Sequence, residues 1–208
     1  SYGDVTTDFR AVRVSNVTAD SPIAISGLPT GGDGVMAYEG RVYYANGLTM
    51  NVGIDYQQEV PAGHHVEYEV SSGSIGKNDD GTYRLTMSDA DMKVTAQLAV
   101  NQYRIDYLDN EANPWKQAAY LFGETIVPLN YAPTVSGYTF TGWSGLPDDL
   151  IMPAHDLTAV PQYAVRSYRL TYYVDNDIVF SDSVAYGTPI TPMEKPQKEG
   201  YTFDGWYS

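Results

Sequence analysis

Histidines and carboxylates are the residues best suited to metal or acid–base chemistry, and their spacing in this sequence does not form such a site. A zinc site needs two or three histidines that converge with a carboxylate, and the chain has only His64, His65 and His155. His64 and His65 follow an expected turn at 61–63, and consecutive strand residues point to opposite faces. His155 lies in another expected turn. We therefore predict no metal site and no cofactor.

The sequence also lacks the patterns of nucleophilic catalysis and of calcium binding. It contains no cysteine and no G-x-S-x-G elbow. The acidic runs at 78–81 and 175–177 offer oxygen ligands, but neither has the twelve-residue spacing of a calcium loop. No pair of carboxylates stands out for glycoside hydrolysis. We predict turns at both acidic runs, no catalytic residues and no enzyme activity.

The charge of the chain argues against two classes of partner. The net charge is −14, and each half, 1–100 and 101–208, carries 13 acidic against 6 basic residues. Such a field repels phosphate backbones, so we expect no nucleic-acid partner. No apolar run approaches the roughly 18 residues of a membrane span, so we expect no membrane insertion.

The strongest pattern in the sequence is an internal repeat. GYTFTGW at 137–143 returns as GYTFDGW at 200–206, and residues 85–107 align with 150–172 with nine identities in 23 positions. A catalytic loop is needed once, whereas a stacked structural unit is rewritten each time it recurs. We therefore predict a structural signature, not a ligand site. Its residues are Gly137, Tyr138, Phe140, Gly142, Trp143, Gly200, Tyr201, Phe203, Gly205 and Trp206.

The repeat divides the chain into three expected parts. These are an N-terminal β domain at 1–100, a complete repeat unit at 101–165 and a repeat unit lacking its last strand at 166–208. Residues 56–100 resemble a degenerate copy, in which a constant shift places Asn78 opposite Trp143. The joints are short and contain no Gly or Pro run, which predicts limited freedom between units. The missing last strand predicts that the chain continues.

Strand and turn signals dominate between these motifs. The segments 168–174 and 178–184 are rich in β-branched and aromatic residues and flank a turn, which predicts a hairpin. Residues 40–52 predict a second hairpin with a type I′ turn at Asn46-Gly47, and Asp80-Gly81 marks a further turn. Closely spaced prolines at 189, 192 and 196 require an extended crossover.

The repeated heptapeptide predicts an aromatic core for each unit. Tyr138 and Phe140 share one strand face, and strict alternation would turn Trp143 to the other. A bulge at Gly142 would return Trp143 to the core face. We expect all three rings to pack inside their unit, and likewise those of the second copy, Tyr201, Phe203 and Trp206.

These motifs resemble those of the Listeria-Bacteroides repeat family, close to the internalin B-type repeat of bacterial surface proteins. The resemblance covers residues 101–208 and does not clearly cover 1–100. It is carried by the motifs that begin at Tyr103 and Tyr168, the Phe-Gly and Tyr-Gly pairs at 122–123 and 186–187, the two heptapeptides, and the Leu-Pro and Met-Pro-Ala-His-Asp elements within 146–156. The resemblance implies a mainly β chain of small, tandem β-grasp-like units on secreted or wall-attached proteins, without catalytic activity.

Three functions follow as hypotheses. The first is a non-enzymatic, extracellular cell-surface or cell-wall fragment that serves as stalk or spacer and adhesion module, with a host or cell-wall protein or glycan as partner. The alternative is a carbohydrate-binding region ancillary to an exported hydrolase, with Trp115 as the expected exposed stacking platform. The third is an isopeptide-stabilised adhesin domain. Its candidate lysines are Lys77, Lys93, Lys116, Lys195 and Lys198.

Overall fold

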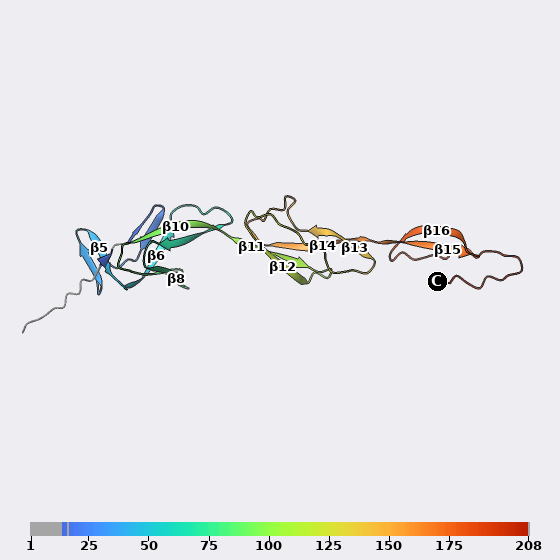
Figure 1. The fold of residues 1–208 in the computed structure, drawn as a ribbon, viewed down its shortest axis with the longest axis horizontal. Helices are drawn as coiled ribbons and strands as arrows, with labels where there is room; N and C mark the ends of the chain where they lie inside the picture. Colours follow the sequence, from blue (N-terminus) through green and yellow to red (C-terminus); the bar gives the residue numbers. More distant parts are fainter. Residues whose placement is uncertain (1–13, 16, 208) are drawn as a thin grey trace, which may run out of the picture. The chain divides into compact units, whose positions relative to one another are not determined.

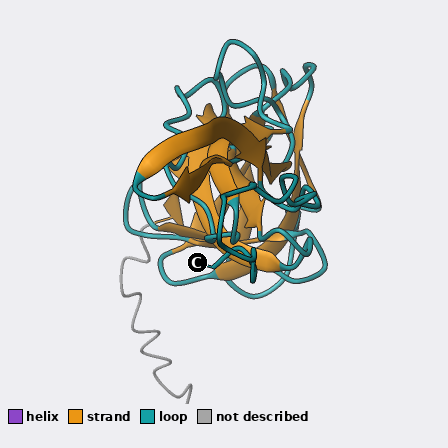
Figure 2. Cartoon of the chain, turned by 90° about the vertical axis from the view of Figure 1, so that its right-hand side faces the viewer, coloured by secondary structure: helices purple, strands orange, loops and turns teal. Residues whose placement is uncertain are grey.

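The computed structural model describes residues 14, 15 and 17–207, and every regular element among them is a β-strand (Figure 2). The expected mainly β class is therefore confirmed, while the β-grasp-like form of the units stays a prediction. Contacts divide the chain into two compact parts, residues 1–101 and 102–208. Residues 1–13 of the expected N-terminal domain lie outside the described residues. The described part of the chain contains no helix that could span a membrane.

The first part contains three small sheets. Two have three strands, in the orders β1-β5-β4 and β2-β10-β7, and the third has four, in the order β3-β6-β9-β8. The strands are β1 (Val14–Ser15), β2 (Val17–Ala19), β3 (Ile23–Ser26), β4 (Val35–Tyr38), β5 (Arg41–Ala45), β6 (Thr49–Tyr56), β7 (His64–Val70), β8 (Ser74–Lys77), β9 (Tyr83–Thr86) and β10 (Met92–Val100).

One apolar core serves these sheets. Apart from Met87, which follows β9, its buried members come from β2, β5, β6, β9 and β10, so strands of all three sheets contribute to it. The side chains are Val17, Tyr44, Met50, Val52, Leu85, Met87, Met92 and Val94.

In this part the turn expected at Asp80-Gly81 forms, and the hairpin expected at 40–52 does not. β8 and β9 pair in an antiparallel register on either side of that turn. β5 and β6 flank Asn46-Gly47 but do not pair with each other, because β5 pairs with β1 and β4 and β6 pairs with β3 and β9. The type I′ hairpin at 40–52 was therefore a wrong prediction. Local turn chemistry favoured it, and the partners available in the folded sheets decided otherwise.

Residues 102–165 form one four-stranded sheet in the order β12-β11-β14-β13 (Figure 1). Its strands are β11 (Gln102–Leu108), β12 (Pro114–Leu121), β13 (Tyr138–Ser144) and β14 (Leu157–Val165). β14 is the last strand in sequence but lies inside the sheet, parallel to β11 and antiparallel to β13. The buried core beneath it consists of Ile105, Tyr107, Ile126, Met152 and Ala159.

The first part repeats this arrangement in an interrupted form. β10 lies between the parallel strand β2 and the antiparallel strand β7, as β14 lies between β11 and β13. The registers agree at matching positions: Met92 pairs with Val17 as Leu157 pairs with Ile105, and Ala96 with Tyr68 as Pro161 with Trp143. The two glycine turns also agree, because the amides of Gly47 and Gly123 donate to Met87 and Met152 at 2.9 Å each.

This correspondence corrects the expected position of the degenerate copy. It begins near Val14, not near Tyr56, and the residue that corresponds to Trp143 is Tyr68, not Asn78. Asn78 instead lies in the turn between β8 and β9. The sheet β3-β6-β9-β8 is inserted between strands of the copy. A constant shift along the sequence cannot detect a copy whose internal spacings have changed.

Among the described residues from 167 to 207, β15 (Ser167–Val174) and β16 (Asp177–Ala185) form a hairpin. Its turn residues Asp175 and Asn176 have φ angles of 50° and 75°, which the left-handed turn requires and Asp and Asn tolerate. The hairpin was expected from the sequence and is confirmed. The proline-rich segment that follows contains neither helix nor strand among its described residues.

Candidate functional site

Three aromatic rings form the centre of the unit at 102–165. Tyr107 of β11 lies 4.8 Å from Trp143 of β13 between ring centroids, and Phe140 lies 5.2 Å from Trp143. The indole Nε1 of Trp143 donates to the carbonyl oxygen of Leu129 at 2.6 Å. Rings at these distances with edge-to-face geometry stabilise a core beyond the area they bury.

A β-bulge places Trp143 on the core face, as the sequence predicted. Phe140 pairs with Tyr163 and Gly142 pairs with Gln162, so Thr141 is the extra residue of β13. Gly142 has a φ of 151°, a backbone conformation that other residues rarely adopt. Without the bulge, alternation would direct Trp143 away from Phe140.

The last unit contains the same three rings in the same arrangement. Tyr172 lies 4.6 Å from Trp206, and Phe203 lies 5.3 Å from it. The Trp206 indole donates to the Met193 carbonyl oxygen at 3.1 Å, which reproduces the bond from Trp143 to Leu129. The aromatic triad is therefore a property of the repeat.

The first tyrosine of each heptapeptide is not a core residue. Tyr138 is 38% exposed and Tyr201 is 72% exposed, so the expectation that they pack inside their units is wrong. Tyr138 begins β13 and contacts the ring of Tyr186, 6.1 Å away. Tyr201 lies outside any strand, and Lys198 lies over its ring.

Trp115 does not stand out as an exposed platform. It is half-buried, as Trp143 and Trp206 are, and one face of its ring stacks on Trp143 at 6.2 Å with an interplanar angle of 23°. Tyr131 meets it edge-on at 5.6 Å, and the Lys116 ammonium lies over both rings. The expectation that Trp115 is the one exposed tryptophan is therefore wrong, because the aromatic core of its unit recruits it.

A joint between the two repeat units forms around Gly137, which sequence reasoning had placed in the heptapeptide signature only. The ring of Tyr186 packs against Gly137 so closely that a Cβ atom at this position would overlap it. Tyr138 and Tyr168 flank the same ring at 6.1 and 6.4 Å. Backbone bonds of 2.8 Å connect Arg166 to Gly137 and Tyr186 to Arg166. The aromatic-Gly pair that occurs as Phe-Gly at 122–123 and as Tyr-Gly at 186–187 was the available signal for this contact.

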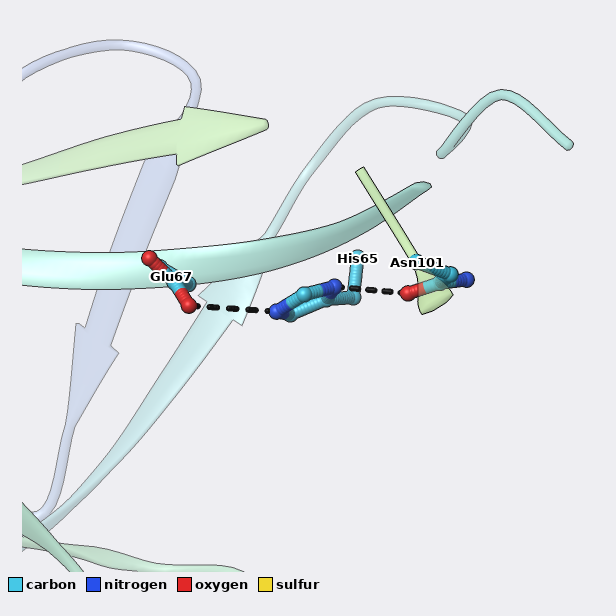
Figure 3. Close-up of polar contacts among 3 residues, drawn as sticks. All are labelled: His65, Glu67 and Asn101. Carbon is cyan, nitrogen blue, oxygen red and sulfur yellow. Dashed lines mark hydrogen bonds and ion pairs between the residues drawn. The ribbon is translucent and has the colours of Figure 1, made fainter. Parts of the chain in front are cut away.

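The histidines do not form a metal site in the described part of the chain, where no group of three potential ligands converges. His65 contacts two polar side chains (Figure 3). Its Nδ1 lies 2.6 Å from the Asn101 side-chain oxygen, and its Nε2 lies 3.2 Å from a Glu67 carboxylate oxygen. His64 and His155 contact backbone carbonyl oxygens. These are local contacts of a strand and its turns.

The acidic residues organise turns. Asp80 accepts hydrogen bonds from the Thr82 amide and hydroxyl, which hold the pKa of its carboxyl below the usual value. Asp109 accepts from the Asn113 and Glu111 amides in the turn between β11 and β12, and these bonds likewise lower its pKa. Such side chains stabilise loops by accepting backbone bonds.

Three of the candidate isopeptide lysines have other partners. Lys93 pairs with Asp20 at 2.8 Å, and Lys198 pairs with Asp175 at 2.6 Å, both at exposed positions. Lys116 contacts the Tyr131 hydroxyl. These three ammonium groups therefore form ordinary surface contacts.

Comparison with protein families identifies the repeated element. The profile of the Listeria-Bacteroides repeat domain matches residues 103–148 and 168–208. Residues 103–208 carry the Listeria-Bacteroides repeat domain. The two matched segments contain the two aromatic triads. This repeat domain is typical of bacterial surface proteins such as internalins and is usually non-catalytic.

Several proteins are similar in sequence to this chain over part of their length. Internalin H of Listeria monocytogenes is 39% identical over 84 residues, which cover 36% of this chain and 15% of internalin H. A protein of Evansella cellulosilytica named "Putative Gly-rich membrane protein" is 29% identical over 132 residues, 56% of this chain and 15% of the relative. A second protein of that organism is 25% identical over 123 residues, 54% of this chain and 18% of the relative. The chain thus spans less than a fifth of each relative.

Proposed function

We propose that this chain is a non-enzymatic part of a bacterial cell-surface or secreted protein, in which tandem β units serve as a stalk or spacer. The observation that supports this most is the connection between successive units. β10 and β11 are separated by Asn101 alone, and β14 and β15 are separated by Arg166 alone. Linkers this short, without glycine, restrict the motion of one unit against the next.

The joint around Gly137 adds to this restriction. Tyr186 of the last unit packs on Gly137 of the preceding one, and the Arg166 backbone bonds to both segments. In repeat proteins, such nearest-neighbour contacts transmit order from one unit to the next. The similarity to internalin H supports an extracellular location at the cell surface or cell wall. We also retain the β-grasp-like unit as part of this proposal.

A distance measurement across the joint tests the spacer function. The chain contains no cysteine, so two cysteines introduced at the exposed turn positions Asn110 and Asn176 would carry the only spin labels. We expect a narrow distribution of label distances by double electron–electron resonance. A matched chain with Gly-Ser-Gly-Ser inserted after Arg166 should give a broad distribution. Equal widths in both chains would contradict a stiff spacer.

An adhesive role would require a partner, and we propose a host or cell-wall protein or glycan, with no nucleic-acid partner. Among the described residues, 22 large hydrophobic side chains remain exposed, many of them tyrosine, and they support a contact surface of this kind. Binding of the chain to immobilised peptidoglycan, to a glycan array and to host-cell surface proteins would test it. Absence of binding in all three assays, alongside a stiff joint, would leave the spacer function without the adhesive one.

A further inference from the structure

A groove lies beside the β-bulge of the unit at 102–165. It has a volume of about 610 Å³, and its walls come from the crossover at 128–130, the bulged part of β13 at 140–143 and the loop at 146–150. Every residue that lines it belongs to this one unit. Because β14 already pairs with both of its neighbours here, the groove is not the place of an unfilled strand.

The floor of this groove is aromatic and aliphatic. Phe140 and Trp143 are half-buried and line it, together with three leucines. Between the two rings in sequence lies Gly142, where a Cβ atom would meet no other atom within 4 Å. Its φ of 151° favours glycine, so no side chain covers the backbone at this point. The bulge is therefore open to close approach by a ligand.

Three exposed polar side chains stand at the rim. Asn130 comes from the crossover, Thr141 from the bulge and Asp148 from the loop. Among the described residues, none of the three has a hydrogen bond or an ion pair with another residue. The neighbouring Asp149, by contrast, accepts from the Ile151 amide. The rim thus offers a carboxamide, a hydroxyl and a carboxylate, which together donate and accept hydrogen bonds that the fold does not use.

The two copies of the repeat keep the floor and change the rim. The floor residues Phe140, Gly142 and Trp143 return as Phe203, Gly205 and Trp206. Thr141 is the position at which the two heptapeptides differ, and its counterpart is Asp204. Asn130 corresponds to Glu194, because each follows the residue whose carbonyl oxygen accepts the indole hydrogen bond. The repeat fold therefore does not depend on the rim side chains, which are free to select a ligand.

The lining favours a neutral ligand that carries many hydroxyl groups. It contains one carboxylate and no lysine, arginine or histidine, in a chain with a net charge of −14. A phosphate, sulfate or carboxylate group would be repelled there. A sugar ring combines an apolar face of C–H groups, which suits the floor, with hydroxyl groups that suit the rim. The bulge disrupts the edge of β13, which disfavours the addition of a peptide strand at this place.

We propose that this groove binds a neutral oligosaccharide. A sugar ring lies against Phe140 and Trp143, and its hydroxyl groups bond to Asp148 and Asn130. The Trp143 indole nitrogen already donates to Leu129, so the ring contributes apolar contact and no hydrogen bond to the sugar. An apolar lining with a few placed polar groups is typical of small-molecule sites. The inference rests on the adhesive part of the proposed function and gives it a ligand class and a site.

A glycan array with neutral, sulfated and uronic-acid oligosaccharides tests the ligand class on the whole chain. We expect binding to neutral members only. Calorimetry with the tightest of them should give an affinity that changes less than about twofold between roughly 50 and 500 mM salt, because no charge pair forms. A lack of binding to every neutral member would overturn the inference and leave the adhesive function with a protein partner. Preference for an anionic member would overturn it as well.

Nuclear magnetic resonance then locates the ligand. The chain has three tryptophans and thus three indole N–H signals. Titration with the tightest neutral oligosaccharide should shift the indole signal of Trp143 and the backbone amides at 140–143. Unchanged signals at 140–143 under saturation would overturn the inference. So would the same shifts on addition of a proline-rich decapeptide if no oligosaccharide produced them, because the ligand would then be a peptide.

Rim variants test the role of the polar side chains. Asp148→Ala should weaken binding by about tenfold or more, and Asn130→Ala by about threefold to tenfold, since a bond to a charged group contributes more. Asn110→Ala is the matched control, because Asn110 is an exposed turn residue outside the groove lining and should not affect binding. Circular dichroism should show all three variants folded. Undiminished affinity in both rim variants would overturn this site, while the adhesive function would stand.

Discussion

The units at 102–165 and 167–207 share an aromatic triad but differ in the burial of their core side chains. Only the unit at 102–165 contains the strand β14 that covers them. The centroid distances from Trp143 to Tyr107 and from Trp206 to Tyr172 are 4.8 and 4.6 Å, and both indoles bond to a carbonyl oxygen of the crossover. Yet Ile126 is 1% exposed, and Ile190, at the matching position, is 55% exposed.

This difference shows that formation of the aromatic triad and burial of the core have separate requirements. The triad needs only a hairpin, an extended crossover and the heptapeptide, all of which both units contain. Burial needs β14, which closes the sheet and brings Met152 and Ala159 into the core. The free energy of folding should therefore be distributed unequally between two units of similar sequence.

The largest expected effect is the loss of the core indole in the middle unit. Trp143→Ala should lower the free energy of unfolding by about 3–5 kcal/mol, because it leaves a cavity against Tyr107 and Phe140. Trp206→Ala should cost less than about 1 kcal/mol, since its surroundings are already open to water. Urea denaturation of the two variants, followed by circular dichroism, measures both. Similar losses would show that the last unit is as tightly packed as the middle one.

A smaller difference in the free energy of unfolding is expected between alanine substitutions of Ile126 and of Ile190. Ile126→Ala should cost about 2–4 kcal/mol, as expected for a fully buried side chain. Ile190→Ala should change stability by less than about 0.5 kcal/mol, as most surface substitutions do. Native-state hydrogen exchange would assign each loss to its unit. A large cost at Ile190 would mean that a neighbour covers it in solution.

The joint glycine and its repeat counterpart form a matched pair. Gly137 and Gly200 have φ angles of 77° and 79°, so alanine carries the same backbone penalty of about 1–2 kcal/mol at either position. Only at Gly137 does the added methyl group also meet the Tyr186 ring, whereas the space at Gly200 is open. Gly137→Ala should therefore cost more than Gly200→Ala.

A double-mutant cycle isolates the contact at the joint. In the Tyr186→Ala background the additional cost of Gly137→Ala should disappear, because the ring it collides with is gone. Thermal denaturation of the unsubstituted chain, the two single variants and the double variant suffices for the measurement. If Gly137→Ala destabilised the Tyr186→Ala chain by the same amount, the Tyr186 ring would not be the cause of the additional loss of stability.

The smallest effect expected is a dependence on alkaline pH. Burial raises the pKa of the Tyr107 hydroxyl, with a smaller contribution from Tyr120 that the Leu129 backbone partly offsets. Because the folded pKa lies above the unfolded value of 10.0, the unfolded chain loses this proton first as pH rises. The stabilisation is complete below about pH 10 and decreases above it. Denaturation between pH 8 and 11 should show a flatter decline in Tyr107→Phe, and identical profiles would assign the decline to other groups.

The sequence by itself determined the parts that depend on short-range pattern. The twin heptapeptides located two of the three rings of each triad, and alternation plus Gly142 located the bulge. The residues at 175–177 located a hairpin, and those at 80–81 located a turn. Trp115 was misjudged because its ring stacks on Trp143, which lies 28 positions further along the chain. Tyr138 was misjudged because it contacts Tyr186, in the next unit.

Tertiary structure alone decided which strands became neighbours. Asn46-Gly47 favours a local hairpin, yet β5 and β6 pair with strands distant in sequence. The interrupted copy in the first part became visible only through its registers, since an inserted sheet had changed the spacing. Local chemistry fixes the conformation of a few residues, whereas burial depends on which distant segment reaches the same core. For that reason nearly the same heptapeptide pairs with β14 in one unit and lies outside any described strand in the other.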